Sequence, residues 1–342
     1  MPIHPLIEFL ARLVRREDLS RDEAFELLEA LLDADATDAQ ISGALVALAA
    51  KGETVDELTG MAEGLRSRAV RVISQHQCFI DTAGTGSSRA KTFNISTAAA
   101  FVIAGAGLPV AKHGNRAASS KSGSADLLTA LGVNVSAIPL VSEQALNEIG
   151  ICFMFAPLYH GATARVAGIR RQLGIHTVFN LLGPLSNPAG APRQIIGVWR
   201  HDLAEKLAHV LSGLGTERAW VVHGEDGLDE ITLAGKTHVA EARNGEVRTF
   251  EISPQEFGFE AGPIEHLRGG DADANAQIVG AVLDCERRDA ARALVIMNAA
   301  AALFLGGAAA DLREGAKLAA HAIDSGEARH KLELLIEATS GP

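Results

Sequence analysis

The sequence predicts an α/β protein: a small helical domain at the N-terminus, then a larger domain with a mainly parallel central sheet and flanking helices. Two observations support this prediction. The first 70 residues carry helix signals and no strand pattern. From about residue 78, short apolar strands alternate with helices, which is typical of a parallel sheet covered by helices. We expect the helical domain over residues 1–73, with part of 160–190 packed on it, and the α/β domain over 74–342.

Amphipathic helices are expected throughout the N-terminal part. The first is the stretch HPLIEFLARLVRRE, and three more begin at capping boxes, in which Ser or Thr precedes Glu or Gln by three residues. Apolar residues at three- and four-residue spacing follow each box, so each helix has a face to bury. The boxes are Ser20 with Glu23, Thr37 with Gln40, and Thr54 with Glu57.

The second part alternates strands and helices. Expected strands are QCFID, LPVAKHG, ICFMFAP, RQIIGVW and RAWVVHG. Expected helices are ISTAAAFVIAGAG, SADLLTALG, TARVAGIRRQLG and LAEKLAHVLSGLG, and two long helices end the chain. The stretch KTHVAEARNGEVRTFEI predicts a hairpin that turns at Asn244-Gly245. The apolar run 293–310 nearly reaches the length of a membrane span, but its Ala and Gly content and Asn298 favour a buried helix with a glycine-broken end.

Composition and charge exclude several classes of protein. The 342 residues are 47% hydrophobic and 21% charged, with a formal net charge of -11. A surface of that sign repels nucleic acid and anionic membranes. Cys78, Cys152 and Cys285 form no CxxC pair, which indicates buried, reduced thiols in a cytoplasmic protein. The N-terminal residues mix charges with apolar side chains and offer no small-residue cleavage site, so we expect no secretory signal.

The loop DTAGTGSSRAKTFNIST has the composition of an anion site. Gly84 and Gly86 allow the backbone to approach an anion, and Asn94, Ser96 and Thr97 lie at the start of a helix. Free amides and the helix dipole favour phosphate at such a place. The loop is neither a Walker A motif nor GxGxxG. Taken alone, an ordinary capped turn explains it equally well.

Two further loops follow strands at the same expected edge of the sheet. KHGNRAASSKSGSAD carries three cations and four serines directly after an apolar strand, an oxyanion-binding composition that a solvated flexible loop explains less well. HGEDGLDE places Asp226, Asp229 and Glu230 after another strand, where oxygen ligands suit Mg²⁺ unless this is merely a solvated acidic turn. Because ligands of α/β sheets bind at the carboxyl ends of strands, the three loops together predict a site for Mg²⁺ and a phosphorylated substrate.

Four segments in their order and spacing resemble the anthranilate phosphoribosyltransferases of tryptophan biosynthesis. They are GTG…KTFNIST, VAKHGNRAASSKSGSAD, RRQLGIHTVFNLLGPLSNP and VVHGEDGLDE, of which the second is highly specific. The resemblance implies a Mg²⁺-dependent glycosyltransferase that acts on phosphoribosyl pyrophosphate and anthranilate, not on nucleic acid or at a membrane. In the implied reaction, the amine of anthranilate attacks C1 of phosphoribosyl pyrophosphate and pyrophosphate leaves. It also implies a homodimer formed through the helical part and an active site between the domains.

The resemblance further implies roles for individual residues. The site for phosphoribosyl pyrophosphate would comprise Gly84, Thr92, Asn94, Ser96, Thr97, Lys112, His113, Gly114, Asn115, Arg116, Ser119, Ser120 and Ser124. Anthranilate would contact Gly84, Asn115 and Arg170, and Mg²⁺ would be held by Ser96, Asp229 and Glu230. The amine of anthranilate is largely neutral at pH 7, so no general base is required. We therefore expect His113 and His160 to be structural or substrate-lining.

One segment departs from the family. Where the family usually reads Gly-Thr-Gly-Gly-Asp, this chain has Ser87-Ser88 after the second glycine, and Arg89 and Lys91 follow. We hypothesise that these two cations contact pyrophosphate directly and partly replace a Mg²⁺-linked contact; the departure would otherwise mark a branch with another aromatic acceptor. A pyrimidine nucleoside phosphorylase is the nearest rival enzyme, although it has no reason to keep Asn115, Arg170 or the acidic loop. A non-catalytic nucleic-acid-binding relative is the other rival, and the net charge of -11 counts against it.

Overall fold

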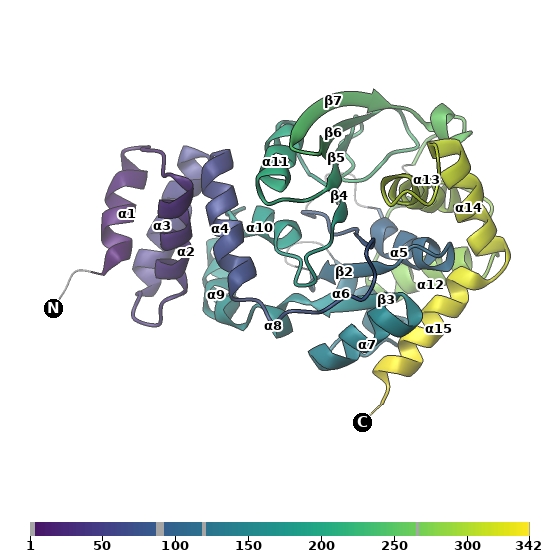
Figure 1. Cartoon of the computed structure of the whole chain (residues 1–342), viewed down its shortest axis with the longest axis horizontal. Coiled ribbons are helices and arrows are strands. Elements are labelled where there is room, and N and C mark those ends of the chain that lie inside the picture. Colours follow the sequence, from purple (N-terminus) through teal and green to yellow (C-terminus); the bar gives the residue numbers. More distant parts are fainter. Residues whose placement is uncertain (1–3, 87–91, 118–120, 265–266, 342) are drawn as a thin grey trace.

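The computed structural model describes residues 4–86, 92–117, 121–264 and 267–341 (Figure 1). All three expected capping boxes are formed, each with the Ser or Thr side chain accepting from the third helical amide and the Glu or Gln side chain accepting from the cap amide. The N-terminal helices are α1 (Pro5–Val14), α2 (Arg21–Leu32), α3 (Asp38–Lys51) and α4 (Val55–Ser67). Figure 1 shows them on one side of the molecule, with α4 beside α10 (Phe179–Leu185).

The second part contains a seven-stranded sheet in the order β3-β2-β1-β4-β5-β6-β7. The strands are β1 (Ile80–Asp81), β2 (Val110–Gly114), β3 (Ile151–Phe155), β4 (Arg193–Gly197), β5 (Arg218–Gly224), β6 (Thr237–Arg243) and β7 (Glu246–Ile252). The first five pair in parallel, whereas β6 and β7 are antiparallel. Their hairpin turns at Asn244 and Gly245 with φ of 53° and 86°, so both central residues of the turn have the positive φ that a type I′ turn requires.

Helices cover both faces of this sheet. The remaining ones are α5 (Ile95–Gly105), α6 (Ser124–Ala130), α7 (Pro139–Ile149), α8 (Ala156–Tyr159), α9 (Ala164–Leu173), α11 (Asp202–Gly213), α12 (Ala272–Leu283), α13 (Ala290–Leu305), α14 (Leu312–Asp324) and α15 (Glu327–Thr339). The expected buried apolar helix is α13, which ends at Leu305 with Gly306 as its C-cap. Within the described residues, no helix combines the length and apolarity that a membrane span needs. The predicted fold class is confirmed.

The sheet faces two separate hydrophobic cores. On β4 and β5, Ile195 and Trp220 belong to the core that contains α5 and α13, whereas Ile196 and Val221 belong to the core that contains the N-terminal helices. This alternation is the two-residue period of strands buried on both faces. Side chains of α9, α10 and α11 also belong to the second core, so they join the N-terminal helices to the sheet.

Candidate active site

The three anion and metal loops meet at one edge of the sheet, as the sequence predicts. The Ser96 amide, at the start of α5, donates to Glu230 Oε1 at 3.2 Å, which joins the first loop to the acidic loop. Lys112 Nζ, from the middle of β2, donates to Thr82 O and Thr82 Oγ1 at 3.0 Å each and to Ser96 Oγ at 3.4 Å. Lys112 therefore connects the second loop to the first.

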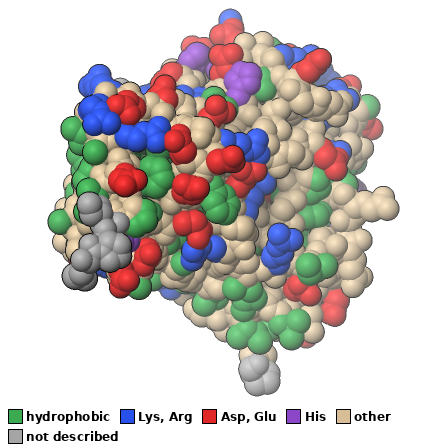
Figure 2. Space-filling view, turned by 60° about the vertical axis from the view of Figure 1, so that its left-hand side comes forward, with side chains coloured by type: hydrophobic (Ala, Val, Ile, Leu, Met, Phe, Trp, Pro, Cys, Tyr) green, Lys and Arg blue, Asp and Glu red, His purple; other side chains and the backbone are tan. Residues whose placement is uncertain are grey.

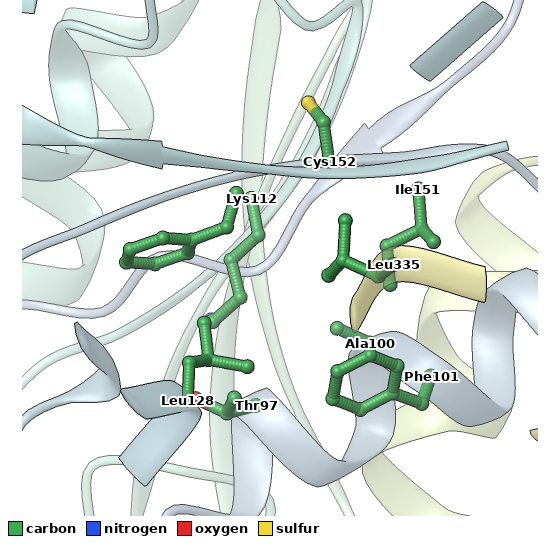
Figure 3. A pocket seen from close by; sticks show the side chains of 9 residues that line it. Thr97, Ala100, Phe101, Lys112, Leu128, Ile151, Cys152 and Leu335 are labelled. Atoms are coloured by element: carbon green, nitrogen blue, oxygen red, sulfur yellow. The ribbon is translucent and has the colours of Figure 1, made fainter. Parts of the chain in front are cut away.

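Lys112 is held in a buried position with its amino group aimed at these loops. The residue is only 4% exposed, and burial lowers the pKa of its amino group while Asp81 and Glu230 oppose that shift. Figure 3 shows its aliphatic stem beside a small, largely apolar cavity of about 10 Å³. The other side chains around that cavity are Thr97, Ala100, Phe101, Leu128, Ile151, Cys152, Phe153 and Leu335. The apolar wall leaves the amino group one polar direction, toward Thr82 and Ser96.

A buried carboxylate that the sequence analysis did not single out fixes the strand ends beneath Lys112. Asp81 Oδ1 accepts from the amides of Ala83 and His113 at 3.0 and 3.1 Å, and its Oδ2 accepts from Asn187 Nδ2 at 2.7 Å. Burial raises the pKa of Asp81 to about 6, although Lys112 lowers it. Asn187 also donates to Ala111 O at 2.9 Å. The sequence does show an aspartate at the end of an apolar strand, which could have indicated this role. Its partner Asn187, however, lies 106 residues further along the chain.

The first loop runs closely along β4. Thr85 donates to Gly197 O through its amide at 2.9 Å and its hydroxyl at 3.0 Å. At Gly84 a Cβ would lie 3.3 Å from the same oxygen, which is tight for any side chain. Asn94 is the N-cap residue of α5, but its side chain does not bond to the helix amides. Instead its Oδ1 accepts from Asn275 Nδ2 at 2.9 Å, and its Nδ2 donates to Ser122 O at 3.4 Å. Asn94 therefore ties the two anion loops to α12.

The other predicted residues of the first loop divide by exposure. Thr97 is buried in the first turn of α5, whereas Thr92 is partly exposed and forms an isolated bridge with Arg268. Gly269 leaves room for this bridge, since a Cβ there would overlap Thr92 O. Arg89 and Lys91, the predicted extra pyrophosphate contacts, lie outside the described residues.

The second loop is organised by Asp126 at the start of α6. Its carboxylate accepts from the amides of Ala117 and Gly123 at 2.9 and 3.0 Å and from Arg116 Nη1 at 2.8 Å. Arg116 is thus paired within the loop. Ser124 Oγ donates to the carbonyl of Asn115, which is exposed, at 3.3 Å.

Gly114 and Ser124, both predicted site residues of this loop, pack closely against each other. A Cβ at Gly114 would overlap Ser124 Oγ, so the serine packs directly against the backbone of β2. Ser119 and Ser120 lie outside the described residues. No hydrogen bond joins Asn115 to Arg170 within the described ranges, so the predicted anthranilate pair is not bonded directly.

The acidic loop is positioned by close backbone packing. A Cβ at Gly197 would overlap Asp229 O, so only glycine lets this loop cross the end of β4. Asn298 of α13 accepts from the Ile231 amide and donates to the Ile231 carbonyl, both at 3.0 Å. This pair of bonds fixes the backbone next to Glu230.

Asp226 is separate from the other two carboxylates of this loop. Its Oδ2 accepts from Thr232 Oγ1 at 2.8 Å and its Oδ1 from the Leu228 amide at 3.2 Å. It therefore stabilises the turn. The sequence alone grouped it with Asp229 and Glu230 because the three are close in the chain.

The remaining oxygen groups fit a Mg²⁺ ion that shares its coordination with a substrate. Burial and then Asp229 raise the pKa of Glu230 to about 8, so two carboxylates are crowded together where a cation would relieve their repulsion. Ser96 bonds to Glu230 through its amide and leaves its hydroxyl on the side of Lys112. Among the described residues, no group of three or more His, Cys, Asp or Glu could hold a metal. A small number of protein ligands is enough for Mg²⁺, because the ion keeps several waters and also binds phosphate oxygens of the substrate.

Replacing Asn298, which is not one of the proposed metal ligands, is expected to weaken Mg²⁺ binding. The variant Asn298→Leu leaves the buried Ile231 amide and carbonyl without partners, and each unsatisfied group costs about 1–3 kcal/mol. The freed backbone should lower Mg²⁺ affinity about tenfold in calorimetric titrations with phosphoribosyl pyrophosphate present. Asn147→Leu is the matched control, since Asn147 also holds two backbone groups, those of Ile73 and Gln75, far from the loops. Equal Mg²⁺ affinity in the two variants would contradict the role given to Asn298.

The two buried histidines are neutral. His113 Nδ1 lies 3.1 Å from Gly183 O, and its ring centroid lies 5.2 Å from that of His160. Burial, and next the neighbouring His160, lower the pKa of His113 to about 3. Burial lowers the pKa of His160 to about 4. At pH 7 both rings are therefore in the neutral imidazole form, with a single N–H each, and neither is an imidazolium.

The buried state of His160 makes the fold sensitive to acid. Its folded pKa of about 4 lies below the unfolded value of about 6.5, so the unfolded chain binds the proton more readily. The contribution of neutral His160 to the unfolding free energy is fully present above pH 6.5 and is lost as the pH falls toward 4. Between pH 7 and 5 we expect the unfolding free energy of the wild type to fall by about 2 kcal/mol more than that of His160→Phe. Urea denaturation at both pH values measures this, with exposed His209→Gln as control; parallel losses in wild type and His160→Phe would refute it.

The guanidinium of Arg170 is largely buried, and some of its hydrogen-bond donors are unused. It lies in the last turn of α9, donates from Nη2 to Asn180 Oδ1 at 3.1 Å and stands 5.5 Å over the Phe179 ring. Burial lowers the pKa of Arg170 from its usual value. Its Nε is buried and has no hydrogen-bond partner among the described residues, and the same holds for Thr177 Oγ1 and His113 Nε2. All three residues adjoin α10: Arg170 bonds to Asn180, His113 lies against Gly183 O, and Thr177 precedes the helix by two residues.

Comparisons with known proteins agree with this geometry. Sequence profiles of the glycosyl transferase family match the chain in two parts: the helical bundle domain at residues 7–69 and the a/b domain at 76–329. The chain is 49% identical over 330 residues to anthranilate phosphoribosyltransferase of Desulfosudis oleivorans, covering 96% of this chain and 97% of that protein. It is 52% identical over 336 residues to that of Anaeromyxobacter dehalogenans, covering 97% and 98%.

Solved structures are similar over nearly the whole chain. Anthranilate phosphoribosyltransferase from Thermus thermophilus superimposes with a TM-score of 0.91 at 38% identity, covering 97% of this chain and 99% of that one. The enzyme from Saccharomyces cerevisiae in complex with PRPP and Mg gives a TM-score of 0.89 at 28% identity, covering 98% of each. The same yeast enzyme is also known in complex with 4-fluoroanthranilate.

Proposed function

The chain belongs to the anthranilate phosphoribosyltransferases of the glycosyl transferase family, and we propose that the residues described above carry out the reaction of that family. The reaction transfers the phosphoribosyl group of phosphoribosyl pyrophosphate to the amine of anthranilate and releases pyrophosphate. The observation that carries the assignment of residues is the meeting of Lys112, Ser96 and Glu230 at the carboxyl edge of the sheet. It combines a buried cation, a helix N-terminus and a carboxylate pair in one place.

Phosphoribosyl pyrophosphate would lie across the two anion loops. Ser96, Asp229 and Glu230 would hold Mg²⁺, which when bound supplies positive charge that offsets the charge of the pyrophosphate. Lys112 and the loop amides stabilise the charge that builds on the departing group, because they are fixed in a buried environment before the reaction starts. The close approaches at Gly84 and Gly114 keep side chains away from the backbone there. The ribosyl carbon becomes electron-poor as the pyrophosphate leaves.

Anthranilate would lie against α9 and α10. The Arg170 guanidinium can pair with the carboxylate of anthranilate through two parallel hydrogen bonds, and its Nε is already buried with no partner in the described part of the chain. This fixes the orientation of the amine toward the ribosyl carbon. The amine is neutral at pH 7 and needs no base to remove a proton before attack, which agrees with the low pKa values of His113 and His160.

Assembly and location are further proposals. The exposed apolar side chains Ile7, Val14 and Val46 on α1 and α3 support a homodimer formed through the N-terminal helices. On the face in Figure 2, which brings that side forward, basic and acidic side chains are interspersed with apolar ones and form no basic patch for nucleic acid. Three free cysteines support a reducing, cytoplasmic location. The domain boundary is proposed between residues 73 and 74, and the roles of Arg89 and Lys91 remain proposals.

The direct test follows anthranilate fluorescence over time with purified protein, Mg²⁺ and phosphoribosyl pyrophosphate. We expect anthranilate to disappear only when both are present. Calorimetric binding of phosphoribosyl pyrophosphate without anthranilate consumption would leave the donor site in place and assign another aromatic acceptor, with Ser87-Ser88 as the first place to look. Phosphorolysis of uridine or thymidine would instead support a pyrimidine nucleoside phosphorylase.

A further inference from the structure

A second pocket lies at the amino-terminal ends of the parallel strands β4 and β5, opposite the carboxyl ends where the three loops meet. Arg193 begins β4, Arg218 begins β5 and Arg243 ends the antiparallel β6. The strand register places Arg193 beside Arg218 and Arg218 beside Arg243, so three arginines form one row across three neighbouring strands. Cross-strand neighbours point to the same face of a sheet, and like charges in that arrangement destabilise it. The row thus opposes sheet stability unless other groups compensate.

Nearby carboxylates compensate only part of this charge. Glu241 accepts from Arg218 Nε at 2.9 Å and also pairs with Arg248, and Glu217 pairs with Arg193. The Arg243 side chain is exposed and has no hydrogen bond or ion pair within the described residues, although its cross-strand neighbour on β7 is Glu246. The four arginines Arg193, Arg218, Arg243 and Arg248 thus face three carboxylates, those of Glu217, Glu241 and Glu246. In a chain whose formal net charge is -11, this row keeps a local excess of positive charge. That excess is available to a ligand.

The row lines a pocket of about 400 Å³, within the size range of small-molecule sites. Its lining residues are Arg193, Glu217, Arg218, Arg243, Asn244, Leu305, Gly306 and Gly307. The wall facing the arginines is the C-terminal end of α13, whose carbonyls would repel an anion. Arg218 covers that end: it donates to Phe304 O at 3.3 Å and stacks 4.3 Å from the Phe304 ring centroid. Arg193 and Arg243 are the guanidiniums that remain on either side of the pocket.

We propose that this pocket binds a small organic anion, whose carboxylate or phosphate group pairs with Arg243 and Arg193 while its body rests on the backbone of Gly306 and Gly307. Guanidinium groups present paired donors that match both kinds of anion. Glu217 would have to yield part of its pairing with Arg193 to the ligand. The site is remote from Lys112, Arg170 and the acidic loop, so it does not depend on the function proposed above.

The test uses two probes with the same body, 4-fluorobenzoate and 4-fluorophenyl phosphate, titrated against the full-length protein and followed by fluorine NMR. At least one should bind the wild type, and the tighter probe identifies the anionic group. Arg243→Ala should weaken binding about tenfold by removing a charged partner, whereas Glu217→Gln should tighten it severalfold by removing the competing carboxylate. Arg71→Ala, at an exposed arginine elsewhere, should leave it unchanged. Arg170→Ala should remove any binding of the probes in the acceptor site and keep the binding that depends on Arg243. Transferase activity without probe should be the same in Arg243→Ala as in the wild type.

Three results would overturn the proposal. The first is that neither probe binds the wild type. The second is that binding is lost in Arg170→Ala and kept in Arg243→Ala, which would place the probe in the acceptor site. The third is that Glu217→Gln weakens binding as Arg243→Ala does. The last outcome would mean that these side chains only stabilise the sheet edge. The opposite signs expected for the two variants separate a binding role from a structural one, since loss of structure would weaken binding in both.

Discussion

Lys112→Met is expected to reduce kcat/KM for phosphoribosyl pyrophosphate by about 10²–10³ or more, the effect of removing one fixed charged donor from a buried site. Methionine has a similar unbranched stem, so it still fills the space beside the small cavity in Figure 3. What disappears is the ammonium group 3.0 Å from Thr82 and 3.4 Å from Ser96. Steady-state kinetics with varied phosphoribosyl pyrophosphate measures the loss.

The matched control for this change is Lys121→Met. Lys121 lies in the same loop but is exposed, so the control removes a charge from the loop while leaving the buried amino group in place. We expect Lys121→Met to change kcat/KM less than about threefold, as is usual for exposed charges screened by solvent. Circular dichroism should show both variants folded. If a folded Lys112→Met keeps more than a tenth of wild-type kcat/KM, Lys112 does not stabilise the departing pyrophosphate.

The loops that form this site could be predicted from the sequence because their signals are local. Glycines, hydroxyls and cations directly after apolar strands predict anion loops, and parallel strands bring such loops to one edge. The contacts between Lys112, Ser96 and Glu230 confirm that these loops meet. Capping boxes are equally local, and all three are formed.

The groups that hold these loops in place could not be predicted, because they act over long stretches of chain. Asp81 meets Asn187 across 106 residues, and Asn298 meets Ile231 across 67. An asparagine in an apolar helix carries no sign of its partner, so the sequence showed only that Asn298 is unsuited to a membrane span. The length of the first strand was overestimated, since of the expected strand QCFID only Ile80–Asp81 pairs in the sheet. The need for glycine at position 197, at the end of β4, becomes clear only once the acidic loop is seen to cross it.

Arg170→Ala is expected to reduce kcat/KM for anthranilate by about 10²–10³ while changing the affinity for phosphoribosyl pyrophosphate less than twofold. The guanidinium is buried, bonded to Asn180 and stacked near Phe179, so it is already oriented to receive a carboxylate. Arg170→Lys should recover only part of the activity, since an ammonium group cannot make the paired bonds. Anthranilate fluorescence gives the kinetics, and calorimetry gives the affinity for the donor.

Arg171→Ala provides the control, since Arg171 is the exposed neighbour on the same helix and its loss should have little effect. The split between the two substrates is what makes the test specific. A general disturbance of α9 would lower activity with both substrates, whereas loss of a carboxylate anchor affects only the acceptor. If Arg170→Ala leaves the KM for anthranilate unchanged, or weakens binding of both substrates equally, Arg170 is a structural residue. The acceptor must then be oriented by another group near α10. Thr177 Oγ1, His113 Nε2 and the ring nitrogens of His160 are buried polar atoms without partners in the described part of the chain.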